Sequence, residues 1–120
     1  MKILHETKDN IVVAKIIGNL SHIESLEFKN YFLPIVEQEG LKGLVVNMRE
    51  VPTVDSAGLA MMINMFVNAN KLRTPVALFN LCHKVKTACE IVRLALIVPH
   101  FHTHDEAIAF IESKIKVVPD

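Results

Sequence analysis

The run Gly43-Leu44-Val45-Val46-Asn47-Met48 constrains the fold more than any other part of the sequence. Its residues are almost continuously apolar and include several β-branched side chains. A strand with one solvent-facing side would instead alternate apolar and polar residues, so this strand should be covered on both faces and lie in the middle of a sheet. Two more β-prone runs precede it, at residues 2–7 and 11–17, and the turn-forming Lys8-Asp9-Asn10 separates them. We expect these two runs to form an antiparallel hairpin.

Helical patterns alternate with strands along the rest of the chain. We expect further strands at about residues 75–80 and 97–101, and helices at about residues 22–39, 56–72, 82–93 and 104–116. The alternation predicts one α/β domain over residues 1–120, because crossover helices pack against the faces of a parallel sheet. The expected sheet is mixed and mostly parallel, with the antiparallel hairpin at its N-terminal end and about four helices.

Two helices begin with a capping box, in which a hydroxyl and a carboxylate each accept a backbone N–H. Ser21 and Glu24 mark the first helix, and Thr103 and Glu106 mark the last. Pro34 lies inside the first helix and removes one backbone hydrogen bond there. We therefore expect a kink in its last turns.

Charge and hydropathy exclude several classes of function. The sequence has 13 basic and 13 acidic residues, so no strong field would attract the chain to nucleic acid or to an anionic membrane. Its longest apolar stretch, residues 57–67, is interrupted by Asn64 and is shorter than the roughly 20 residues that span a bilayer. We expect no membrane insertion. The polar start of the sequence does not fit a secretory signal, and we expect a cytoplasmic location.

The two cysteines, Cys82 and Cys89, fall on the same expected helix. Seven residues of helix separate them by about 10 Å, which is beyond the reach of a disulfide. We interpret them as free thiols that are buried or half-buried.

One segment is more specific: Val45-Val46-Asn47-Met48-Arg49-Glu50-Val51-Pro52-Thr53-Val54-Asp55-Ser56-Ala57-Gly58-Leu59. It resembles the signature of the STAS domain of anti-sigma-factor antagonists, in which a central strand, a short turn and an Asp-Ser-x-Gly-Leu helix start follow in this order. The resemblance covers almost the whole chain, since similar residues recur at Gly18-Asn19-Leu20, Asn80, Val85 and Ile91. The chain departs from the family pattern at Ala57, at the hydrophobic residues 94–98, and at Arg93, where a glycine is usual.

The resemblance implies a non-enzymatic switch in a bacterial cytoplasm, controlled by phosphorylation of Ser56. The unphosphorylated chain would bind an anti-sigma-factor serine kinase and so regulate sigma-factor-dependent transcription. Phosphorylation would release the kinase, and a phosphatase would reverse the change. The resemblance implies no catalytic residue, metal or cofactor. The same domain serves as an accessory subunit of lipid-transport ABC systems and as part of signalling scaffolds, and both remain alternatives.

The position of Ser56 supports such a switch on physical grounds. Unpaired amides and the positive dipole end at the first turn of a helix can accept a phosphate locally. A partner would meet about −1.5 to −2 added charges beside Asp55 on a surface that must be desolvated. The alternative is that Ser56 is only an N-cap, as a serine before an apolar helix usually is.

The helix after Ser56 carries a methionine pattern. Residues Leu59, Met62, Ile63, Phe66 and Val67 fill an inward face, and Met61 and Met65 fall toward the opposite side with Asn64 and Asn68. Methionine suits adaptable binding surfaces, so we expect a partner-binding surface made of Asp55, Ser56, Gly58, Met61 and Met65. The alternative is that a neighbouring element or a second copy of the chain, as a homodimer, covers the two methionines. Basic side chains at Lys84, Lys86 and Arg93 could add a rim.

Other chemistry finds less support. His100, His102 and His104 would share one face of an extended strand, but no carboxylate or thiol completes a metal site. Ser56 lacks the glycine two positions earlier that a nucleophile elbow needs, and the sequence has no phosphate-binding loop. A receiver domain would need an acidic pair after its first strand, which Glu6 alone does not provide. An enzyme or small-ligand binder that uses the three histidines remains the rival from another class.

Overall fold

The computed structural model describes residues 1–114, except for the side chains of residues 22–25. A single five-stranded sheet has the order β1-β2-β3-β4-β5. Strands β1 (Lys2–Lys8) and β2 (Ile11–Ile17) are antiparallel, whereas β2 pairs in parallel with β3 (Gly43–Glu50) and β3 with β4 (Val76–Phe79). The short β5 (His100–Phe101) completes the parallel part beside β4. The predicted mixed sheet with a central third strand is confirmed.

The hairpin turn follows from its two central residues. Asp9 and Asn10 have φ of 54° and 64°, the left-handed backbone that twists a two-residue turn to match its strands. Asp and Asn tolerate this backbone better than most side chains do. The sequence Asp9-Asn10 therefore fixes where β1 reverses into β2.

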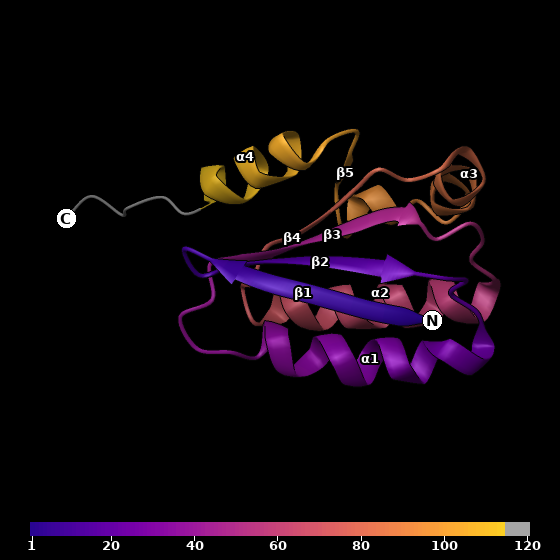
Figure 1. Ribbon diagram of the computed structural model, residues 1–120, viewed down its shortest axis with the longest axis horizontal. Helices are drawn as coiled ribbons and strands as arrows, with labels where there is room; N and C mark the ends of the chain where they lie inside the picture. The colour runs from indigo at the N-terminus through magenta and orange to yellow at the C-terminus, as the bar shows by residue number, and fades with distance from the viewer. Residues whose placement is uncertain (115–120) are drawn as a thin grey trace.

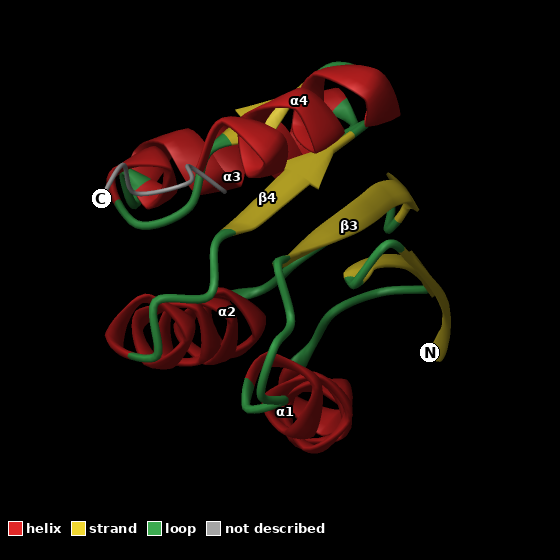
Figure 2. Ribbon diagram, turned by 90° about the vertical axis from the view of Figure 1, so that its left-hand side faces the viewer, coloured by secondary structure: helices red, strands yellow, loops and turns green. Residues whose placement is uncertain are grey.

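The helices form a layer on each face of the sheet. Helices α1 (His22–Val36) and α2 (Ser56–Lys71) lie side by side beneath it, and α4 (His104–Lys114) lies above it (Figures 1 and 2). Helix α3 (His83–Ile91) and the 3₁₀ turn η1 (Leu94–Leu96) lie between β4 and β5 in the chain. All four expected helices are present.

Strand β3 separates two hydrophobic clusters and contributes to both. Leu44, Val46 and Met48 join the larger cluster on the side of α1 and α2, whereas Val45 joins the smaller one on the side of α4. Gly43 allows α4 to approach the sheet, because a Cβ there would come within 2.5 Å of Ile111 Cγ2. The continuous apolar run of the sequence is thus explained by helices on both faces.

One helix and one strand are shorter than expected. Helix α1 contains Pro34 and ends at Val36 rather than near residue 39, because Val36 is its last buried residue and the next four are exposed. Only part of residues 97–101 is strand, since η1 takes up the apolar residues before β5.

The Thr103–Glu106 capping box is confirmed by two hydrogen bonds. The Glu106 N–H donates to Thr103 Oγ1 at 3.2 Å, and the Thr103 N–H donates to Glu106 Oε1 at 3.1 Å. The side chain of Glu24 and the end of the last expected helix lie outside the described part of the chain.

Candidate functional site

The loop between β3 and α2 is fixed at the carboxyl edge of the sheet. Leu20 bridges in parallel to Val54, its N–H donates to the Thr53 carbonyl at 3.0 Å, and its own carbonyl accepts the Asp55 N–H at 3.2 Å. The Thr53 hydroxyl also donates to Asn19 Oδ1 at 2.8 Å. These bonds hold the start of α2 against the β2–α1 connection.

Asp55, and not Ser56, is the N-cap of α2. Its backbone is extended, with φ −95° and ψ 178°, and its Oδ1 accepts the Gly58 N–H at 2.8 Å. Ser56 is then the first helical residue, and it is exposed. The alternative that Ser56 serves only as an N-cap is therefore wrong, because Asp55 already holds the cap.

Gly58 allows the first turn of α2 to pack closely against Leu20 and Val54, and it does not form an open surface for a partner. It is buried, and a Cβ there would lie 2.4 Å from the Leu20 carbonyl oxygen and 3.0 Å from Val54 Cγ2. No side chain fits without movement of the backbone. The Gly-Leu part of the signature thus packs α2 against the Leu20 connection.

The methionine surface expected from the sequence is only partly present. Met65 is fully buried, with no exposed area, in the same cluster as Phe28, Phe32 and Phe66. The expectation that Met65 faces outward is wrong, because α1 packs beside α2 and covers that side (Figure 2). Met61 is half-buried against the same cluster. The alternative that a neighbouring element covers the methionines is correct for Met65.

Other residues of α2 are exposed or half-buried. Ser56, Ala60 and Asn64 are exposed at successive turns, and Ile63 and Val67 beside them are half-buried. We call these five residues the α2 stripe. Ile63 packs in part against the larger cluster, in agreement with its expected inward position, and Val67 is half-buried. Asp55 is exposed at the head of the stripe.

The start of α3 contacts the loop that leads to Ser56. The Cys82 thiol lies 3.5 Å from the Val51 carbonyl oxygen and 3.7 Å from that of Pro52. Both cysteines are free, Cys82 half-buried and Cys89 buried. Burial raises the pKa of the Cys89 thiol to about 11, and the charge of Glu90 adds to the rise. Free thiols were expected from the spacing of the two cysteines.

The three alternating histidines do not converge on one point. His104 begins α4, where its ring packs edge-on against Phe79 at 5.6 Å and its Nδ1 lies 3.1 Å from Asp105 Oδ1. His100 and His102 line a cavity between β5 and α3 instead. Within residues 1–21 and 26–114, no three His, Cys, Asp or Glu side chains are grouped to hold a metal ion. Of the expected basic rim, Lys84 and Arg93 are exposed, and Lys86 lines that cavity.

The sheet, its two helical layers and the capped start of α2 define an α/β domain of the STAS type. The sequence profile of the STAS domain matches residues 2–107, so the chain belongs to this family. A search of curated proteins found no match. No helix in the described part of the chain combines the length and apolar character needed to cross a membrane.

Solved structures share the fold at low sequence identity. A Thermotoga maritima protein assigned as an anti-sigma factor antagonist is 19% identical, with a TM-score of 0.83 over 92% of this chain and 94% of that one. The anti-sigma factor antagonist SpoIIAA, in its unphosphorylated form, is 16% identical, with a TM-score of 0.70 over 92% and 98%. The mouse anion transporter Slc26a9 is 15% identical, with a TM-score of 0.79 over 90% of this chain and 18% of the transporter.

Proposed function

We propose that this chain is an anti-sigma-factor antagonist controlled by phosphorylation of Ser56. In its unphosphorylated form it binds an anti-sigma-factor serine kinase and so frees a sigma factor. The phosphorylated form releases the kinase, and a phosphatase restores binding. The chain is itself not an enzyme in this scheme, since the kinase supplies the ATP site. Such a function belongs to the cytoplasm of a bacterium.

The observation that carries the proposal is the division of roles between Asp55 and Ser56. Asp55 holds the helix cap, so the exposed Ser56 hydroxyl can change without loss of that hydrogen bond. The first turn of α2 contains no acidic residue, and its amides and dipole favour a nearby phosphate. Phosphorylation is therefore compatible with the folded domain. The solved form of SpoIIAA is named as unphosphorylated, which agrees with a switch of this kind.

The effect on a partner is larger than the effect on the fold. Two unit charges about 6 Å apart near a surface interact by roughly 3 kcal/mol at an effective dielectric of about 20. The local dipole benefit is about 0.3 to 1 kcal/mol. A kinase with an acidic group opposite Ser56 would thus bind the phosphorylated chain about a hundredfold more weakly than the unphosphorylated one. This difference is sufficient for a switch.

The test combines intact mass with binding, after incubation with the candidate anti-sigma kinase and ATP. We expect one added phosphate on the native chain and on Ser113→Ala, a control at an exposed serine of α4, but none on Ser56→Ala. Ser56→Asp should bind the kinase about a hundredfold more weakly than Ser56→Ala. An unmodified chain whose binding is the same in all variants would refute the regulatory role and leave a constitutive docking domain.

The match to part of the Slc26a9 chain favours a second candidate, in which the domain docks to a transporter. The corresponding role for a separate STAS chain is that of an accessory subunit of a lipid-transport ABC system. A transporter ATPase that co-purifies with the tagged chain, in place of a serine kinase, would decide for this candidate. A scaffold role would instead give a larger assembly that contains other STAS proteins.

A further inference from the structure

A cavity of about 400 Å³ opens at the carboxyl ends of the parallel strands. Its lining comes from the ends of β3, β4 and β5 and from the start of α3: Arg49, Asn80, Leu81, Cys82, Lys86, His100, Phe101 and His102. Open α/β sheets commonly bind ligands outside the carboxyl ends of their strands. The volume is in the range of small-molecule sites. Ser56 is not among the lining residues, and this cavity is separate from the proposed phosphorylation site.

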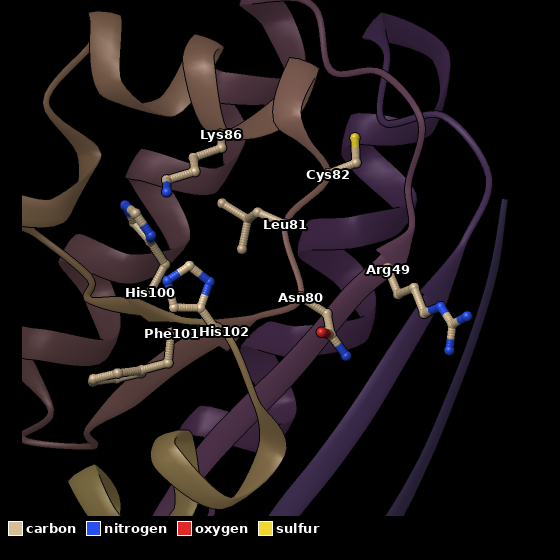
Figure 3. A pocket seen from close by; sticks show the side chains of 8 residues that line it. All are labelled: Arg49, Asn80, Leu81, Cys82, Lys86, His100, Phe101 and His102. Atoms are coloured by element: carbon tan, nitrogen blue, oxygen red, sulfur yellow. The ribbon is translucent and has the colours of Figure 1, made fainter.

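Four basic side chains line this cavity. Arg49 and Lys86 carry a positive charge, and His100 and His102 can acquire one. Figure 3 shows Lys86 extending from α3 toward the His100 ring, with the His102 ring beside them. The Arg49 guanidinium points away from this group in the same view. Lys86, His100 and His102 therefore form the core of the cluster, which we call the basic cavity, and Arg49 lies on its rim.

The electrostatic surroundings of His100 agree with this arrangement. Burial lowers the pKa of His100 below its usual value, and Lys86 lowers it further. Glu90, also on α3, acts in the opposite sense but more weakly than Lys86, and His102 adds a small further lowering. Glu90 and Arg93 line a neighbouring depression on the other side of His100. The net field at His100 is thus that of neighbouring cations.

Asn80 adds a neutral hydrogen-bond donor to the same cavity. Its backbone is left-handed, with φ 60°, and its N–H donates to the Phe101 carbonyl at 3.1 Å. Asn80 lines the cavity at the end of β4, and in Figure 3 its side-chain amide points away from the two histidine rings, on the side where Arg49 lies. Leu81 supplies an apolar surface beside it. An apolar surface next to several basic side chains suits an anion attached to a small organic group.

We propose that the basic cavity binds an oxyanion of the phosphate class, free or as a small phosphomonoester, through Lys86, His100 and His102. A bound anion favours the charged imidazolium form of His100, so it opposes the lowering of the pKa of His100 by burial and Lys86. By linkage, the affinity of the site for an anion rises as pH falls through the histidine range. The inference does not depend on phosphorylation of Ser56.

The first test uses sulfate, since sulfate keeps its charge while the histidines titrate. Binding is followed by NMR of the histidine rings at constant ionic strength, with chloride as the balancing salt. We expect saturable shifts of the His100 and His102 signals, and affinity about tenfold higher near pH 5.5 than near pH 8. Shifts that do not saturate, or that chloride reproduces, would show an unspecific salt effect and overturn the site.

Matched variants distinguish sulfate binding in the cavity from unspecific attraction of sulfate to exposed basic side chains. Lys86→Gln should weaken sulfate binding about tenfold, the usual effect of a lost charge-assisted hydrogen bond. Lys84→Gln removes the same charge from an exposed position two residues earlier and should leave binding unchanged. His100→Gln with His102→Gln should abolish the pH dependence. Equal effects of Lys84→Gln and Lys86→Gln, with both proteins folded by circular dichroism, would refute the proposal.

A comparison of inorganic phosphate with phenyl phosphate at pH 8 distinguishes the two sources of the anion. Tighter binding of phenyl phosphate would assign the site to a phosphomonoester whose organic group contacts Leu81. Equal or tighter binding of inorganic phosphate would assign it to the free anion. Failure of both to compete with sulfate would contradict the proposal.

Discussion

Replacement of Gly58 by alanine tests how the start of α2 is built. The new Cβ would lie 2.4 Å from the Leu20 carbonyl oxygen and 3.0 Å from the Leu20 carbonyl carbon. That carbonyl cannot easily move, because it accepts the Asp55 N–H at 3.2 Å. Overpacking of this kind costs typically about 1–3 kcal/mol, and the rigid obstacle here indicates the upper end. Alanine regains about 1 kcal/mol of helix propensity over glycine. We expect a net loss of about 2 kcal/mol.

Urea denaturation followed by circular dichroism measures this loss, since the chain has no tryptophan. With a slope of about 2 kcal/mol per molar urea, the midpoint should fall by about 1 M. Ala60→Gly, at an exposed position of the same helix, calibrates the propensity term and should cost about 1 kcal/mol. The reasoning is refuted if Gly58→Ala stabilises the chain by as much as Ala60→Gly destabilises it. That result would mean that the close approach to Leu20 does not exist.

Three further predictions concern the cap, the end of α3 and the two thiols. Asp55→Ala should destabilise the chain by about 1 kcal/mol in urea, whereas Ser56→Ala should change its stability by less than about 0.5 kcal/mol, since Asp55 holds the cap; the reverse order would return the cap to Ser56. Arg93 has a left-handed backbone, with φ 55°, which glycine adopts more readily than arginine does. Arg93→Gly should therefore raise the free energy of unfolding by about 0.5–1 kcal/mol. A decrease in that free energy would show that the Arg93 side chain stabilises the turn. Cys89, whose pKa is raised to about 11 by burial, should stay unmodified by a thiol reagent at neutral pH while the half-buried Cys82 reacts; equal rates by peptide mass mapping would contradict the burial.

The order of elements could be predicted because each one has a local signal in the sequence. The apolar run of β3 indicated its central place, the Asp9-Asn10 turn indicated the hairpin, and Thr103 with Glu106 marked the start of α4. These signals are short-range, since a strand covered on both faces, a tight turn and a capping box each depend on a few adjacent residues. The family resemblance rested on residues that proved to fix the start of α2.

The roles within the site could not be assigned in the same way. Asp55 and Ser56 are both good capping residues, and only the backbone geometry shows that Asp55 accepts the Gly58 N–H. The burial of Met65 depends on where α1 packs, and the helical pattern of α2 alone does not contain that information. The basic cavity could not be predicted, because Lys86 lies on α3 whereas His100 and His102 lie at β5. The alternation of His100 and His102 was its one signal in the sequence, and it was considered as a metal site.

The α2 stripe offers the cleanest test of partner binding, because Asp55 and Gly58 also hold the fold together. Variants at those two positions would confuse loss of stability with loss of contact. Ala60 is exposed one turn after Ser56, so Ala60→Arg keeps a good helix former and should leave the urea midpoint unchanged. A long charged side chain at the centre of an interface should nevertheless weaken kinase binding at least about tenfold. Ala109→Arg places the same side chain on the exposed face of α4 and should bind as the native chain does. Native affinity in Ala60→Arg would place the kinase on another face and separate the phosphorylation of Ser56 from partner contact along α2.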